Sequence, residues 1–246
     1  ISELLEIKKG ITAVIGSGGK TSLILRLADE LKINGKVVFC TTTRIMRPEH
    51  MPVIIEDTSD DSAGEPARGL ERQLRSTGVV PVCVGTTAIE DSRKLSAPAT
   101  EIITICKAAD YVLVEADGAR HCHMKAHAAH EPVIPEGTRR TILLVGVEGF
   151  GKPISKTVHR PELFAALAGV SMNEPVTPHI LAKVLLAEKD KFGPAPITVV
   201  INRTARDFDD ESSIPESDLL YAGELKNLTG FDVCAGAVIP GILQRL

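Results

Sequence analysis

Short, almost entirely apolar runs alternate with helical stretches along this chain, and that alternation limits the possible fold more than any other feature. Runs in which nearly every residue is apolar are typical of strands buried on both faces, as in a parallel sheet covered by helices. The predicted strands are 11–15, 37–39, 79–84, 111–116, 141–147, 197–201 and 231–237. The sequence therefore predicts an α/β fold with a doubly wound, mostly parallel sheet flanked by helices.

Helix signals lie between these strands. Residues 21–32 read as an amphipathic helix, Thr177 followed by Pro178 is typical of a helix start, and Pro161 opens another helix in the same way. The polar stretch 56–69 is predicted to be a surface loop or insertion. No linker divides the chain, so we expect a single domain over residues 1–246.

Composition narrows the class of partner. The 246 residues carry 28 Lys and Arg against 32 Asp and Glu, a net charge of −4, without the basic run that a nucleic-acid partner would favour. No apolar run approaches the roughly 18 residues that a membrane-spanning helix needs. The five cysteines are odd in number, widely spaced and without a CxxC pair, which disfavours a disulfide framework. We therefore expect a cytoplasmic protein with neither a nucleic-acid nor a membrane partner.

The strongest motif is VIGSGGKTS at 14–22, where a strand runs into a Gly-rich turn and then a helix. Glycines let backbone N–H groups approach phosphate oxygens, and the helix N-terminus adds partial positive charge there. Lys20 would bridge the β- and γ-phosphates, and the Thr21 hydroxyl would bind Mg²⁺. The motif predicts binding of ATP or GTP with Mg²⁺. The predicted nucleotide contacts in this loop are Gly16, Ser17, Gly18, Gly19, Lys20, Thr21 and Ser22.

The loop departs from the eight-residue phosphate-loop pattern, because Val14 stands where that pattern has Gly. The shorter pattern G-[ST]-x-G-K-[ST] is present instead and looks like the loop of the Mur ligases. A Gly-rich turn that binds nothing is the alternative. The strand–turn–helix context favours phosphate binding.

Acidic residues follow the strand at 111–116. Glu115 and Asp117 are two apart, so on a continuing strand they project to the same face, where either one could bind Mg²⁺ or orient an attacking water. Carboxylates that merely mark a solvated strand end are the alternative. After the strand at 37–39, the hydroxyls of Thr41, Thr42 and Thr43 could contact a γ-phosphate or its Mg²⁺, or form only a polar turn.

The segment 119–135 is rich in histidine and follows the acidic strand directly. In a substrate loop, Lys125 could stabilise transferring negative charge, and His130 or Glu131 could handle protons. Alternatively, His123 and His127 would share one face of a helix and could bind Zn²⁺ or another transition metal, although their spacing matches no closed zinc pattern.

The remaining candidate follows the strand at 197–201. Asn202 could face the nucleotide base, but Ala205 lacks the carboxylate that would select guanine. The choice between ATP and GTP therefore stays open.

Together these motifs resemble the YqeC family, accessory proteins of selenium-dependent molybdenum hydroxylases. The resemblance rests on GSGGKTS, CTTTRIMRP, VEADGAR, KAHAAHEPVIP, LLVGVEGFGKPI and VHRPEL. It implies a phosphate-loop NTPase-like fold, and a nucleotide-dependent role in maturing a molybdenum hydroxylase, which, with its cofactor, would be the partner. This chain departs from the family pattern at His127, where proline is usual, and at Ala205, where an acidic residue is common.

The leading hypothesis is a Mg²⁺-dependent NTPase or phosphoryl-transfer enzyme that assists this maturation. A cofactor or metal carrier, switched by nucleotide without hydrolysis, is the first alternative. An ATP-dependent ligase that acts through an acyl phosphate is the second.

Overall fold

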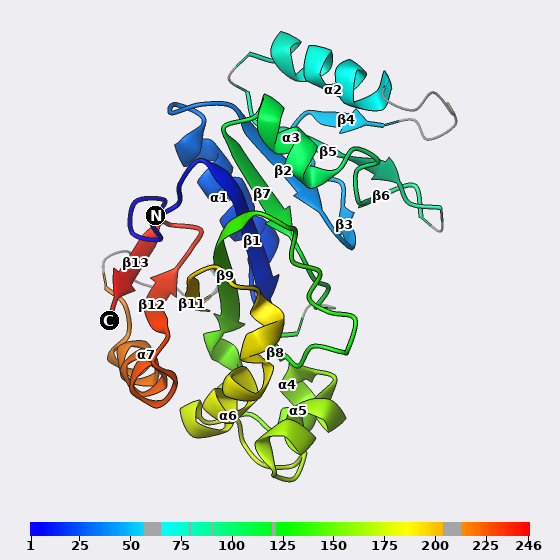
Figure 1. The fold of residues 1–246 in the computed structure, drawn as a ribbon. Helices are drawn as coiled ribbons and strands as arrows, with labels where there is room; N and C mark the ends of the chain where they lie inside the picture. The colour runs from blue at the N-terminus through cyan, green and yellow to red at the C-terminus, as the bar shows by residue number, and fades with distance from the viewer. Residues whose placement is uncertain (57–64, 79, 90, 120–121, 204–212) are drawn as a thin grey trace.

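The computed structural model describes residues 1–56, 65–78, 80–89, 91–119, 122–203 and 213–246. Its centre is a large, mostly parallel mixed sheet flanked by helices (Figure 1), which confirms the predicted fold class at that level. Within the described part of the chain, no helix combines the length and apolarity needed to cross a membrane.

The main sheet has the strand order β13-β12-β11-β9-β1-β7-β2-β5-β6-β3, and β4 pairs with β5. Its strands are β1 (Gly10–Gly16), β2 (Val37–Thr41), β3 (Arg44–Met46), β4 (Val53–Ile55), β5 (Val82–Thr87), β6 (Lys94–Ser96), β7 (Tyr111–Glu115), β9 (Thr138–Gly146), β11 (Ile197–Asn202), β12 (Asp232–Ala237) and β13 (Ile242–Arg245). Strands β12 through β5, and β4, pair in parallel, whereas β13, β6 and β3 pair antiparallel.

The predicted strands correspond to β1, β2, β5, β7, β9, β11 and β12, with ends shifted by a few residues. The strand predicted at 79–84 begins at Val82 and continues to Thr87, and residue 79 lies outside the described residues. A separate short sheet pairs β8 (Met124–Lys125) with β10 (Val158–His159) in parallel.

The helices are α1 (Lys20–Leu31), α2 (Glu65–Ser76), α3 (Ile102–Ala108), α4 (Ile154–Thr157), α5 (Pro161–Ala168), α6 (Pro178–Glu188) and α7 (Glu216–Thr229), with 3-10 turns η1 (Val147–Gly149) and η2 (Lys189–Phe192). The predicted start of α6 is confirmed, since the Thr177 side chain accepts a hydrogen bond from the backbone N–H of Ile180 and Pro178 follows it. Pro161 likewise opens α5.

The prediction of a polar loop over 56–69 is partly wrong, because α2 begins at Glu65. Leu70 and Leu74, one helical turn apart, are both buried, and this apolar pair gives α2 a face that packs on the core. Residues 57–64 lie outside the described residues.

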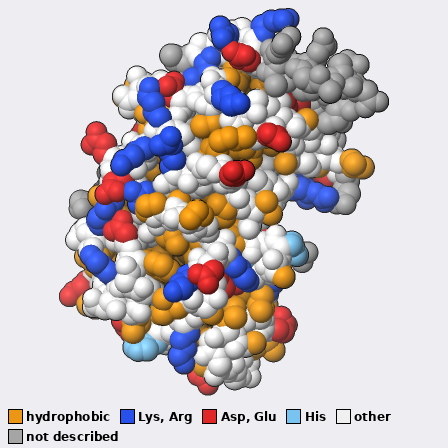
Figure 2. Space-filling view, viewed as in Figure 1, with side chains coloured by type: hydrophobic (Ala, Val, Ile, Leu, Met, Phe, Trp, Pro, Cys, Tyr) orange, Lys and Arg blue, Asp and Glu red, His pale blue; other side chains and the backbone are white. Residues whose placement is uncertain are grey.

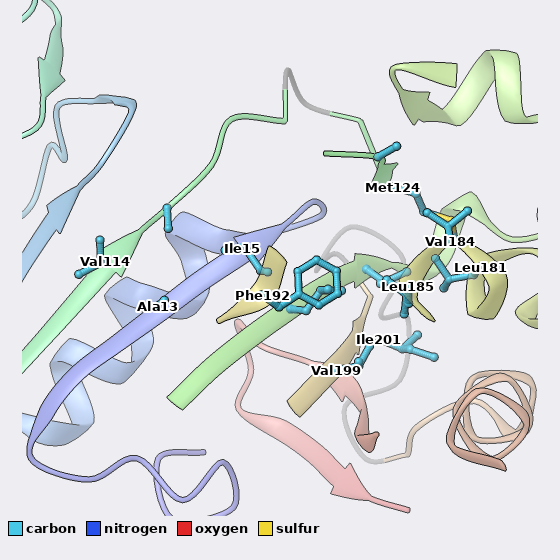
Figure 3. Packing of buried hydrophobic residues seen from close by; sticks show 14 of the residues in the cluster. Ala13, Ile15, Val114, Met124, Leu181, Val184, Leu185, Phe192, Val199 and Ile201 are labelled. Atoms are coloured by element: carbon cyan, nitrogen blue, oxygen red, sulfur yellow. The ribbon is translucent and has the colours of Figure 1, made fainter. Parts of the chain in front are cut away.

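Both faces of the sheet are buried, which explains why the strands are almost continuously apolar. In β1, Ile11, Ala13 and Ile15 belong to one hydrophobic cluster, while Val14 belongs to the other, together with α1. Figure 3 shows Ala13 and Ile15 on the side of the sheet where Phe192 and the leucines of α6 pack. Because β1, β7, β9 and β2 are parallel, their carboxyl ends meet at one edge of the sheet.

Candidate functional site

The Gly-rich turn between β1 and α1 uses backbone conformations that favour glycine. Gly16, Gly18 and Gly19 have φ values of 91°, 87° and 117°. The turn also passes very close to β9, since a Cβ atom on Gly16 would lie 2.2 Å from the carbonyl oxygen of Leu144. These glycines therefore fix both the shape and the position of the turn.

Gly18→Ala is expected to lower the free energy of unfolding by about 2 kcal/mol or more, because of backbone strain and overpacking. A Cβ atom there would lie 2.6 Å from Cα and from N of Gly146. Gly118→Ala is the matched control, since a Cβ atom on Gly118 meets nothing within 4 Å. Denaturant titration of both variants checks this, and equal losses would contradict it.

The predicted lysine, hydroxyl and carboxylates come together at the start of α1. The Thr21 hydroxyl donates to Oε2 of Glu115 at 2.8 Å. Lys20 Nζ lies 2.9 Å from Oδ1 of Asp117 and 3.7 Å from Oε1 of Glu115, and it donates to the carbonyl oxygen of Gly16 at 2.9 Å. The parallel pairing of β1 with β7 produces this arrangement by placing Val14 opposite Glu115.

The two carboxylates differ in their environment. Asp117 is fully buried, and its Oδ2 lies 2.9 Å from each of three donors, which are Gly16 N, Lys125 Nζ and His127 Nε2. Burial opposes its ionisation, but the charge of Lys20, the bond from His127 and the charge of Lys125 outweigh burial and hold the pKa of Asp117 well below its usual range. Asp117 is therefore a fixed anion.

Glu115 shows the opposite shift. Burial raises the pKa of Glu115 more than the charge of Lys20 and the bond from Thr21 lower it. A carboxyl group with a raised pKa can exchange its proton for a cation or pass it to a neighbour. Of the two carboxylates, Glu115 is therefore the better suited to bind a cation or to transfer a proton during a reaction.

Lys125 is the second buried lysine beside Asp117. Its Nζ donates to the carbonyl oxygen of Gly118 at 2.5 Å and lies 3.0 Å from Oε2 of Glu131. Arg160 donates to the same oxygen of Glu131 at 2.7 Å. Burial raises the pKa of Glu131, but the hydrogen bond from Arg160 and the charge of Lys125 outweigh burial and hold this pKa below its usual value. This geometry favours Glu131 as a counter-ion over a proton-handling role, and His130 is exposed at the surface.

The threonines after β2 lie beside the end of β7. The Thr41 hydroxyl and the Thr42 backbone N–H both donate to the carbonyl oxygen of Glu115, at 2.7 and 3.2 Å. The Thr42 hydroxyl donates to the carbonyl oxygen of Val133 at 2.9 Å, and Thr43 N donates to Thr41 Oγ1 at 3.0 Å. The three threonines 41–43 therefore lie beside the end of β7, and the Thr42 hydroxyl is engaged by the protein.

Asn202 has a role that the sequence did not predict. Its Nδ2 donates to the carbonyl oxygen of Gly18 at 2.7 Å, and its Oδ1 accepts from Val238 N at 2.9 Å. Both ends of the amide thus join β11 to the Gly-rich turn and to the residue after β12. This arrangement favours support of the turn over contact with a base, and Ala205 lies outside the described residues.

The two histidines considered as a metal site, His123 and His127, do not lie on a helix. Residues 122–127 are not helical, because β8 pairs with β10, so the helical spacing does not apply. The Nδ1 atom of His123 lies 3.5 Å from Glu148, whereas both ring nitrogens of His127 contact carboxylates. The described residues contain no group of three or more His, Cys, Asp or Glu that could hold a metal ion, and His121 lies outside them.

On the molecular surface, a hollow opens between the part that contains β3 and the part that contains α4 and α5 (Figure 2). Lys and Arg side chains are interspersed with Asp and Glu on the face shown there. This face therefore carries its positive and negative charges mixed.

Fold and site together define an α/β protein in which a Gly-rich strand–helix turn holds a lysine and a hydroxyl against two carboxylates, one at the end of a neighbouring parallel strand and one just after it. The family model described as "YqeC protein" matches residues 12–162, more than half of the chain, and the chain belongs to the YqeC family. It is 31% identical over 166 residues to "Uncharacterized protein YqeC" of Escherichia coli (strain K12). That alignment covers 65% of this chain and 61% of the relative, so it spans less than two thirds of the relative's length.

Proposed function

We propose that the chain binds ATP or GTP with Mg²⁺ at residues 16–22 and hydrolyses or transfers the terminal phosphoryl group. The observation that carries this proposal is the meeting of Lys20 and Thr21, at the N-terminus of α1, with Glu115 and Asp117. A lysine, a metal-binding hydroxyl and an acidic strand end are the groups that phosphoryl transfer from a nucleotide requires.

Backbone N–H groups that no described residue engages support phosphate binding. No described residue accepts a hydrogen bond from the backbone N–H of residues 18–22. Such groups at a helix N-terminus are typical ligands of phosphate oxygens. The N–H groups of Gly16 and Ser17 are engaged, by Asp117 and by Leu144, so the proposed cradle begins at Gly18.

The 2.8 Å contact between Thr21 and Glu115 supports a Mg²⁺ position. Mg²⁺ is usually held by one or two protein oxygens together with waters and phosphate oxygens, so these two residues fit it. Bound there, the ion would neutralise phosphate charge. Asp117, whose Oδ2 accepts from Gly16 N and whose Oδ1 lies 2.9 Å from Lys20 Nζ, would anchor Lys20, and Glu115 would orient the attacking water.

The cellular role that we propose rests on family resemblance rather than on the geometry of the site. We infer that nucleotide binding assists maturation of a selenium-dependent molybdenum hydroxylase in the cytoplasm, with that enzyme or its cofactor as partner. The family match covers residues 12–162, a region that includes the Gly-rich turn, Glu115 and Asp117.

Calorimetric titration with non-hydrolysable ATP and GTP analogues, with and without Mg²⁺, tests the proposal. Lys20→Ala is expected to weaken Mg²⁺-nucleotide binding by about 10- to 100-fold, the loss typical of a charged hydrogen bond. Lys9→Ala, which removes an exposed lysine at the other end of β1, is the matched control. If the unmodified protein binds neither analogue, or if Lys20→Ala binds as tightly, the proposal is wrong. Measurement of phosphate release from ATP and GTP then distinguishes an NTPase, which releases phosphate, from a nucleotide-switched carrier, which does not hydrolyse the nucleotide.

A further inference from the structure

We propose that His127 and Glu188 are positioning residues for Lys20, because they hold the Asp117 carboxylate against the Gly-rich turn. This inference rests on the proposed nucleotide site. It concerns two residues that are too deeply buried to touch a nucleotide themselves, since the exposed fractions of their side chains are 2% and 1%.

The contacts form a continuous path from α6 to the turn. Glu188, the last residue of α6, accepts from the backbone N–H of His127 at 2.8 Å, and its other oxygen lies 2.8 Å from His127 Nδ1. The opposite ring nitrogen of His127 lies 2.9 Å from Oδ2 of Asp117. Asp117 in turn contacts Gly16 N and Lys20 Nζ.

The imidazole ring has little freedom to move along this path. Glu188 contacts the backbone N–H of His127 and one ring nitrogen, Nδ1, and the ring packs edge-on against Phe192 with centroids 5.4 Å apart. Lys191 donates to the carbonyl oxygen of His127 at 2.8 Å. A side chain held by its neighbours in this way can fix the orientation of the carboxylate that it contacts.

Asp117 needs such orientation because it touches the turn twice. One of its oxygens accepts from Gly16 N, and the other lies beside Lys20. A rotation of the carboxylate would break one contact or the other and would move the ammonium group relative to the N–H groups of α1. Geometry at that scale decides how well a charged group meets a phosphate.

Four variants test the inference. His127→Leu removes both ring contacts, Glu188→Gln removes the charge behind the ring, and His127→Gln keeps a polar side chain. The control is His179→Gln, because His179 also lies on α6 and pairs with a carboxylate, but this pair with Glu224 is exposed. Two quantities are measured: affinity for the Mg²⁺-bound analogue, and hydrogen-exchange protection of the Gly16 amide by NMR without nucleotide. The Gly10 amide, which bonds to Asp110 at the other end of β1, is the reference.

We expect His127→Leu and Glu188→Gln to weaken nucleotide affinity by about tenfold or more, in the range usual for residues that orient a binding group. His127→Gln should recover part of that loss, and His179→Gln should change nothing. In His127→Leu and Glu188→Gln, the Gly16 amide should lose hydrogen-exchange protection while the Gly10 amide keeps its protection.

Unchanged Gly16 protection, or equal losses at Gly16 and Gly10, would overturn the inference, because the pair would then have no specific effect on the turn. The exchange measurement does not require nucleotide. It therefore decides the positioning role even if the unmodified protein fails to bind either analogue, a result that would overturn only the proposed function.

Discussion

Asp117→Asn is expected to lower the free energy of unfolding by about 3–5 kcal/mol, the cost usual for breaking a buried ion pair by removing one partner. The carboxylate is fully buried, with Lys20, Lys125 and the His127 ring around it. In Asp117→Asn, the side chains of Lys20, Lys125 and His127 remain in the interior but have lost the carboxylate charge that balances them. Denaturant titration measures the loss.

A double variant provides the control for that prediction. Asp117→Asn combined with Lys125→Met removes one buried cation with the anion, so we expect it to lose less stability than the two single changes added together. A loss below about 1 kcal/mol for Asp117→Asn would contradict the buried network described above.

The same carboxylate predicts how stability responds to acid. Because the pKa of Asp117 is lower in the folded protein than the value of about 4 expected in the unfolded chain, its contribution is complete above that value. The contribution is then lost as the pH falls toward the folded pKa. Below about pH 4, the unmodified protein should therefore lose stability more steeply than Asp117→Asn.

Glu115→Gln is expected to remove most of the gain in nucleotide affinity that Mg²⁺ provides, about 10- to 100-fold, and to lower any turnover at least as much. The amide can still accept from Thr21, but it carries no charge for the ion. Binding without Mg²⁺ should change little, because the N–H groups of α1 and Lys20 are untouched.

Calorimetry with and without Mg²⁺ checks this second prediction. Thr21→Val should reduce the Mg²⁺-dependent gain in the same way, since it removes the other proposed ligand. The control is Glu224→Gln, because Glu224 is an exposed residue of α7 that pairs with His179 of α6. If Glu115→Gln keeps the full Mg²⁺-dependent gain, Glu115 does not hold the ion.

Local patterns were sufficient to predict most of the sheet. Strands such as β1 and β7 are buried on both faces and therefore appear as continuous apolar runs. The short strands β3 and β6 were missed, since three residues are too few to show a period. Helix α2 was missed because most of its residues are polar, and its apolar face rests on the buried pair Leu70 and Leu74.

Part of the candidate site could likewise be predicted from the sequence, and part could not. Lys20 and Thr21 are adjacent in sequence, and Glu115 reaches them because it ends a strand that pairs with β1. Glu188 lies 61 residues from His127, and no rule of spacing joins a helix end to a loop at that distance. Only the packing of α6 on the sheet reveals why His127 is buried between two carboxylates.

The shape of the Gly-rich turn also depends on a strand that lies far along the chain, because Gly18 and Asn202 are 184 residues apart. Asn202 bonds to Gly18, whereas the family match ends at residue 162. The residues that would touch phosphate thus lie in the segment that the family model matches, while one of the residues that hold them comes from beyond it. If this chain binds nucleotide as proposed, a substitution at Asn202 would alter the affinity without changing the Gly-rich motif itself.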